Sequence, residues 1–208
     1  MKKEEKVLSY YVLCNKLKNT IRTGWLNWNV KKDRLESVAE HVFGVQMLAI
    51  AINSEYEYDI DIMKVIYMLA IHEIGETIIG DLTQFQISKE EKKKIEQKAV
   101  CQVLSPLKDK NYIENLFIEF DEMKTPEAKF AYQCDKLECD LQCKLYDQEN
   151  TVDLLDQKEN QTINNPLVKT LLEEGNSWSS MWLEFSKESY PYDENFQNIS
   201  NYARKNKI

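Results

Sequence analysis

The sequence is poor in the residues that interrupt helices. Its 208 residues include five glycines and four prolines, both well below the average usage in soluble proteins. Leucine, isoleucine, lysine and glutamate, by contrast, are abundant and are compatible with helices. A chain of this length is expected to form one domain with a substantial core. The composition therefore predicts a single all-α domain.

Two further absences narrow the class of protein. The five cysteines include no CxxC pair, which argues against a disulfide framework or a structural zinc knuckle and predicts free thiols in a reducing compartment. The net charge of −8 offers no basic surface to a nucleic acid polymer. It still permits a small anionic substrate, because a metal ion and a few cationic side chains reverse the sign locally.

The sequence also lacks long apolar runs. No segment has about eighteen consecutive apolar residues, so no membrane span is expected. The start, MKKEEKV, has no apolar stretch that would suit a signal peptide. The predicted location is the cytoplasm.

Apolar residues at helical spacing predict most of the secondary structure. The expected helices are residues 4–21, 38–54, 62–79, 89–105, 111–122, 126–148, 166–174, 178–189 and a last one from about 193. Residues 22–36 are expected to be irregular, and the polar residues 149–165, in which Asn and Gln cluster, are expected to form a surface connection. The apolar segment 65–71 also suits a buried strand, but the helical spacing continues to Ile78, which favours a helix.

Capping residues and glycines mark some helix ends. Ser37 and Glu40 form a capping box in front of the helix at 38–54. His41 lies one turn before Val45 of its apolar stripe and is therefore expected to face inward. Gly75 lies inside the next predicted helix, where it costs roughly 1 kcal/mol relative to alanine, and indicates close approach by another backbone. Gly80 is expected to end that helix.

Histidine is scarce, and both histidines stand beside carboxylates. His41 ends the string ESVAEH, and His72 opens the string HEIGETIIGD. A third acidic string, CDKLECD, follows at residues 134–140. Histidine and carboxylate side chains gathered from three helices are suitable ligands for a divalent metal ion.

The spacing of these residues suits a metal site. On a helix, His72 and Glu76 share a face, and Glu73 is rotated from them by about 100°. Asp135 lies in the middle of a predicted helix near its inward stripe, where an unpaired charge is costly. A set of His41, His72, Glu73 and Asp135 leaves positions open for water and substrate, as a catalytic site requires.

Four motifs resemble those of a known family. ESVAEH, HExxExxxxGD and TPEAKFxxxxDKLE, preceded by RTGW at 22–25, are similar to the HD-domain metal-dependent phosphohydrolases, and most similar to their 5′-deoxynucleotidase-like branch. The resemblance runs from about residue 17 to about 147. It implies one HD-type helical bundle over residues 1–208, with further helices at about 166–205, one divalent ion at its centre and a homodimer.

The resemblance also implies the metal ligands. His41, His72 and Asp135 occupy ligand positions, and Glu73 stands where the family normally has aspartate. Two histidines cannot form the histidine-rich two-metal sites of cyclic-nucleotide phosphodiesterases or of HD-type oxygenases. Manganese, cobalt, iron, zinc and nickel ions all tolerate this mixture of ligands.

The implied activity is hydrolysis of a nucleoside 5′-monophosphate. Glu76 and Asp81 are the expected catalytic residues, which hold the attacking water or serve the leaving oxygen. Arg22 suits the phosphate, because its guanidinium offers a fork of donors. Trp25 and Lys136 are further candidates for contact with the substrate, although a tryptophan in the core and a solvated lysine are the structural alternatives.

Two other functions are compatible with the same motifs. One is a nucleotide pyrophosphohydrolase or phosphodiesterase. The other is a non-catalytic module that binds a metal and a nucleotide, for which the glutamate at position 73 is the favourable feature. The products formed from different nucleotides distinguish the three.

Overall fold

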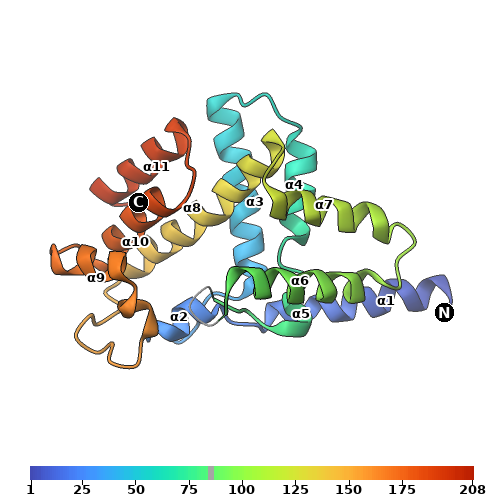
Figure 1. The fold of residues 1–208 in the computed structure, drawn as a ribbon, viewed down its shortest axis with the longest axis horizontal. Coiled ribbons are helices and arrows are strands. Elements are labelled where there is room, and N and C mark those ends of the chain that lie inside the picture. The colour runs from blue at the N-terminus through green and yellow to red at the C-terminus, as the bar shows by residue number, and fades with distance from the viewer. Residues whose placement is uncertain (84–86) are drawn as a thin grey trace. The chain divides into compact units, whose positions relative to one another are not determined.

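The computed structural model describes residues 1–83 and 87–208 and is built from helices (Figure 1). Within those residues the only β-type pairing is an isolated bridge between Ile21 and Ser37. This confirms the predicted all-α fold. In the part of the chain that is described, no helix has the length and apolar character needed to cross a membrane.

The chain forms two compact units, each assembled from two segments. The first contains residues 1–23 and 36–132, and the second contains residues 24–35 and 133–208. Helix α8 (Pro126–Gln148) contributes its first turns to the first unit and its remainder to the second. Helix α2 (Thr23–Asn27) is divided in the same way: Thr23 is the last residue of the first segment of the first unit, and the rest of the helix belongs to the second unit. Its presence corrects the expectation that residues 22–36 are irregular throughout.

The first unit carries most of the predicted site residues. Helix α3 packs against α4, α5 against α6, and α7 against both α4 and α6. The bounds are α1 Lys3–Cys14, η1 Asn15–Lys18, α3 Val38–Tyr56, α4 Ile62–Ile71, α5 Glu76–Ile79, α6 Lys89–Leu104 and α7 Lys110–Glu122. The first predicted helix therefore ends its α-helical part earlier than expected and continues as a short 3-10 turn.

Helix α3 begins at the predicted capping box. The Ser37 hydroxyl accepts the Glu40 backbone N–H, and the Glu40 carboxylate accepts the Ser37 N–H at 2.9 Å. These bonds satisfy donors that the first turn of a helix otherwise leaves without partners. His41, one residue later, is fully buried, as its place on the apolar stripe predicts.

The helix predicted over 62–79 is interrupted. Helix α4 ends at Ile71, and α5 begins at Glu76. Between them the backbone winds more tightly, since the Ile74 N–H donates to the Ile71 carbonyl at 3.1 Å and the Glu76 N–H donates to the Glu73 carbonyl at 3.0 Å. Such bonds between residues three apart are typical of a 3-10 turn. The expectation that His72 and Glu76 share one face of a regular α-helix is therefore wrong.

The interruption coincides with a close contact at Gly75. A β-carbon on Gly75 would lie 3.3 Å from Cγ2 of Val100 and 3.4 Å from the carbonyl oxygen of Glu96, both on α6. This confirms the predicted close approach of another backbone. The missing side chain lets α6 support the turn that carries Glu73 and Glu76.

The second unit is built around aromatic residues. Trp25, Trp28 and Trp178 are buried together with Tyr146 and Phe185 in one apolar cluster. The helices of this unit, besides its share of α2 and α8, are η2 Gln161–Asn164, α9 Pro166–Glu173, α10 Trp178–Ser189 and α11 Glu194–Lys205. These bounds confirm the three helices predicted at the end of the chain.

Candidate metal centre

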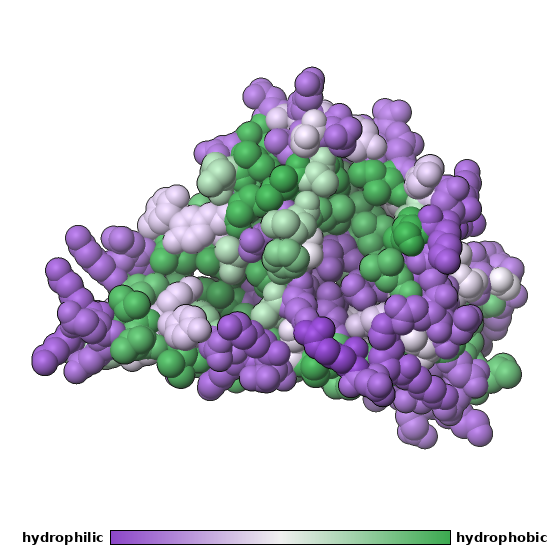
Figure 2. Space-filling view, turned by 180° about the vertical axis from the view of Figure 1, so that it is seen from behind, coloured by the Kyte–Doolittle hydropathy of each residue, from purple (hydrophilic) through white to green (hydrophobic). Residues whose placement is uncertain are grey.

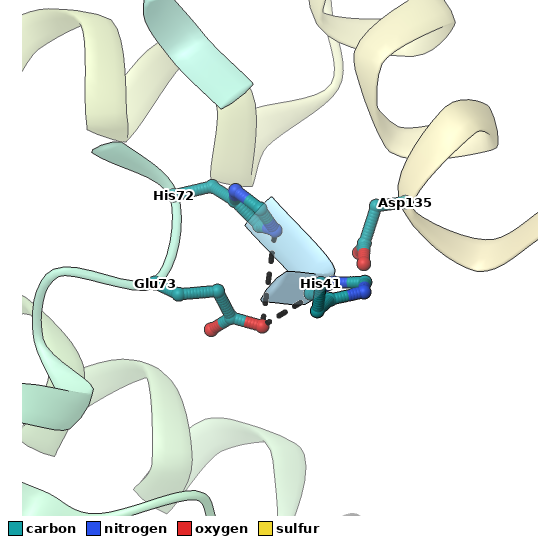
Figure 3. Close-up of side chains that lie close together, drawn as sticks. All are labelled: His41, His72, Glu73 and Asp135. Carbon is teal, nitrogen blue, oxygen red and sulfur yellow. Dashed lines mark ion pairs between the residues drawn. The ribbon is translucent and has the colours of Figure 1, made fainter. Parts of the chain in front are cut away.

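Three side chains of the first unit converge on one point (Figure 3). His41 comes from the first turns of α3, His72 caps the end of α4, and Glu73 follows it in the tight turn. Oε1 of Glu73 lies 3.9 Å from Nε2 of His41 and 3.8 Å from Nε2 of His72. The two imidazole rings have centroids 5.5 Å apart.

The orientation of His72 is fixed by the backbone. Its Nδ1 lies 2.7 Å from the carbonyl oxygen of Leu69. A carbonyl accepts hydrogen bonds only, so the proton is on Nδ1, and Nε2 presents its lone pair on the side of Glu73. A histidine that donates one ring N–H to a carbonyl is a common arrangement for a metal ligand.

The donor set fits a divalent ion. The ligand atoms of His41, His72 and Glu73 all lie within 4.8 Å of one another, and the two histidines are buried. Ligand atoms on one tetrahedral zinc ion lie roughly 3.3 Å apart, given metal–ligand distances of about 2.0–2.1 Å. Small side-chain movements therefore suffice for all three to bind one ion. Imidazole and carboxylate together suit borderline transition metals.

Arg22 borders this group of ligands. Its Nη1 lies 3.1 Å from Oε1 of Glu73 and 4.0 Å from Oδ1 of Asp81. The backbone N–H of Arg22 donates to the carbonyl of Glu36 at 3.1 Å, which ties this segment to the start of α3. The predicted phosphate-binding cation thus lies next to the predicted metal ligands.

Asp81 follows the glycine that ends α5. Gly80 has a φ of +74°, a conformation that residues with a β-carbon adopt only with strain. Its N–H donates to the Glu76 carbonyl at 2.9 Å and closes the helix, as predicted. The turn brings the Asp81 carboxylate, which is 8% exposed, to Arg22.

Replacing Gly80 with alanine is expected to destabilise the protein by about 1–3 kcal/mol, because the added β-carbon strains this backbone conformation. Among residues 1–83 and 87–208, no atom beyond Gly80 and its two chain neighbours lies within 4 Å of the new β-carbon, so the cost comes from the backbone conformation. Chemical denaturation measures it. An unchanged midpoint and slope would contradict the conformational requirement, and Gly24→Ala, which also meets open space but has no positive φ, is the matched control.

Glu76 is the most deeply buried carboxylate of this group, with 3% of its surface exposed. Within the described residues, neither of its oxygens has a hydrogen-bond partner. Burial, and then the negative charges of Glu73 and Asp81, raise the pKa of Glu76 well above the usual range, against the opposing effect of Arg22. A carboxyl with a raised pKa is suited to proton transfer near neutral pH.

Three predicted residues belong to the second unit. Asp135 is buried on α8, 6% exposed, and its Oδ2 lies 2.8 Å from Nζ of Lys136. Nζ of Lys136 also lies 5.8 Å from the centre of the Tyr190 ring. Trp25 packs edge-on against Tyr146 and Trp178, with centroids 5.2 and 6.1 Å away. This environment is that of a core tryptophan, the structural alternative to substrate contact.

The first unit thus brings together six of the nine predicted site residues, namely Arg22, His41, His72, Glu73, Glu76 and Asp81. One residue of the same neighbourhood was not predicted. Thr23 makes two hydrogen bonds to Asp81. Threonine has no chemistry that marks it as a site residue, and the contact joins positions 58 apart in the sequence. Its one sequence signal is its place beside Arg22 in the RTGW string.

Comparison with known proteins adds independent information. A family model described as HD domain matches residues 14–169. The 5′-deoxynucleotidase HDDC2 of Dictyostelium discoideum is 33% identical over 150 residues, covering 68% of this chain and 78% of that protein. The 5′-deoxynucleotidase hdd1 of Schizosaccharomyces pombe is 32% identical, covering 64% and 68%. A crystal structure of a Pyrococcus horikoshii protein has the same fold, with a TM-score of 0.63 at 24% identity over 95% of this chain and 98% of that one.

Proposed function

Because this chain belongs to the HD-domain family and is a metal-dependent hydrolase, we propose that it converts nucleoside 5′-monophosphates, with deoxynucleotides preferred, to nucleoside and phosphate. Two relatives similar to this chain are named 5′-deoxynucleotidases. The observation that carries the proposal is the juxtaposition of Arg22 with the ligand group, since Nη1 lies 3.1 Å from the Glu73 carboxylate.

In the proposed site, His41, His72 and Glu73 bind one divalent ion, whose identity among manganese, cobalt, iron, zinc and nickel is left to experiment. A bound divalent ion supplies Lewis-acid chemistry and lowers the pKa of water. Asp135 is proposed as the fourth ligand. Its support is its place in the DKLE motif, which the resemblance to the HD-domain family marks as a ligand position, and its burial on α8.

The reaction adds water to phosphorus and breaks the bond to the 5′ oxygen. Glu76 holds the attacking water and accepts its proton, a role that its raised pKa favours. Asp81, whose Oδ1 lies 4.0 Å from Nη1 of Arg22, serves the departing 5′ oxygen, which must gain a proton. Arg22 donates to the phosphate oxygens, because its planar fork of donors matches phosphate geometry.

Lys136 and Trp25 are proposed as weaker contributors to substrate binding. Their support is sequence position, since Lys136 follows Asp135 and Trp25 follows Arg22 in RTGW. Substitution of Trp25 is also expected to disturb the aromatic cluster in which it is buried. The effect of a Trp25 substitution on the KM for the nucleotide therefore has to be measured together with its effect on thermal stability.

The proposal predicts phosphate release that depends on both metal and nucleotide. Metal-stripped protein is supplied separately with Mn²⁺, Co²⁺, Zn²⁺ or Mg²⁺ and with ribo- and deoxyribonucleoside monophosphates. Phosphate should appear with at least one transition metal, because the nitrogen ligands favour such ions over Mg²⁺. Pyrophosphate or a nucleoside monophosphate released from larger nucleotides would support the other hydrolase reactions. Nucleotide binding, seen as a thermal shift without any product, would support a regulatory module.

The protein is proposed to be a homodimer. Phe43, Met47 and Ile50 of α3 are between 43% and 63% exposed and fall on one face of the helix. Hydrophobic residues also reach the surface among hydrophilic ones on the face shown in Figure 2. Contiguous exposed apolar patches often mark protein contacts. Light scattering should give twice the chain mass, and Met47→Lys should reduce it to one chain.

We also propose that residues 1–208 form one HD-type domain and that the protein is cytoplasmic. All five cysteines are free thiols, which suits a reducing compartment. The one-domain statement predicts a single unfolding transition that coincides when it is followed with two different probes. Localisation of the tagged protein tests the cytoplasmic location.

A further inference from the structure

Thr23 forms hydrogen bonds with both the side chain and the backbone of Asp81. The backbone N–H of Thr23 donates to Oδ2 of Asp81 at 2.5 Å, and its hydroxyl donates to the Asp81 carbonyl oxygen at 2.7 Å. Within the described residues, no other hydrogen-bond donor to the Asp81 carboxylate is found. Oδ1 of the same carboxylate faces Arg22 at 4.0 Å.

The segment that carries Thr23 is itself held in place. The Arg22 N–H donates to the Glu36 carbonyl at 3.1 Å, and the Val38 N–H donates to the Thr20 carbonyl at 2.8 Å. These bonds surround the bridge between Ile21 and Ser37. The segment is therefore joined to the start of α3, three residues before His41.

Asp81 lies just beyond the end of α5 and outside any helix. It comes directly after Gly80, which has a positive φ, and residues 81–83 belong to no helix or strand. A carboxylate that serves a leaving group must be held to within a fraction of an ångström, because small displacements reduce rates steeply. The constraint has to come from elsewhere in the fold.

We propose that Thr23 is a positioning residue for the reaction. Its hydroxyl fixes the backbone of Asp81, and its N–H fixes the carboxylate relative to Arg22. The inference rests on the proposed function, since it assigns Thr23 a role through Asp81. Thr23 itself makes no contact with the reacting atoms.

Replacing Thr23 with valine removes the hydroxyl but keeps the branched shape and the backbone N–H. The kcat is expected to fall about tenfold, the rate equivalent of one net hydrogen bond, while KM for the nucleotide changes less than threefold. Thr23→Ser retains the donor and should restore most of the rate. Thr23→Ala removes the same donor and gives the test a second form if the valine variant fails to fold.

A double-mutant cycle separates positioning from general destabilisation. In an Asp81→Asn background, Thr23→Val should have little further effect on kcat, whereas a loss of stability would act equally in both backgrounds. Wild-type kcat in Thr23→Val, or equal losses in the valine and serine variants, would overturn the inference while leaving Asp81 catalytic. Full activity in Asp81→Asn alone would instead overturn the proposed role of Asp81.

Discussion

Replacing Glu76 with glutamine is expected to lower kcat by about 10²–10⁴-fold, the usual contribution of a general acid or base. Glutamine keeps the size and one oxygen acceptor but cannot take a proton at neutral pH. The metal content should be unchanged, because His41, His72 and Glu73 are intact. Steady-state kinetics and metal analysis of the same preparation provide both readouts.

The matched control is Glu96→Gln. Glu96 lies on α6, is also partly buried with a raised pKa, and forms an ion pair with Lys92 at 3.3 Å. It has no assigned part in the reaction, so its replacement should change kcat by no more than a few fold. Comparable losses in both variants would mean that charge in this region, rather than proton transfer at Glu76, controls the rate.

Stability provides a second test of Glu76, in metal-stripped protein. Burial, followed by Glu73 and Asp81, raises the folded-state pKa of Glu76 above the ordinary value of 4.5, so folding disfavours its charged form. Above the raised pKa the wild-type protein carries this penalty, and the glutamine variant does not. As the pH falls below that pKa, the folded wild type takes up a proton, and the penalty shrinks until the pH reaches the ordinary value of 4.5. Glu76→Gln should therefore be more stable at pH 8, by an amount that shrinks towards pH 5. A variant less stable than the wild type at pH 8 would contradict this.

Features set by neighbouring residues could be predicted from the sequence. The capping box of Ser37 and Glu40 lies within four residues, and the stop at Gly80 depends on one residue's conformational freedom. The pattern of apolar residues placed His41 on an inward face, and it is fully buried. Such features depend on local geometry, which the residue types largely determine.

Features that depend on packing could not be predicted. The tight turn at 72–75 forms where Gly75 meets Glu96 and Val100 of α6, which lie more than twenty residues later in the chain. Helical spacing alone favoured an uninterrupted helix. The hydrogen bonds of Thr23 to Asp81 join positions 58 apart. The clustering of His41 with His72 followed from the motifs that they share with the HD-domain family, not from spacing. The assignment of Asp135 as a ligand is still a prediction.

Replacing His72 with alanine is expected to abolish both metal binding and activity. The wild-type protein should unfold at a higher temperature when a suitable ion is added, since a ligand at 100 times its Kd stabilises the folded state by about 2.7 kcal/mol. His72→Ala should show little or no such shift. It removes one of two imidazoles whose Nε2 atoms lie within 4 Å of the Glu73 carboxylate. The ligands that remain, with one imidazole in place of two, bind such ions far more weakly.

The packing around His72 supplies the control for this experiment. The ring of Phe120 lies 5.3 Å from that of His72, so Phe120→Leu disturbs the same neighbourhood without removing a ligand. It should lower stability with and without metal by a similar amount and retain the metal-induced shift. If His72→Ala retained the shift as well, the ion would bind elsewhere. If both variants lost it, the effect would reflect packing around the imidazole rather than coordination. Only loss in His72→Ala alone identifies His72 as a ligand, because only there is the nitrogen removed.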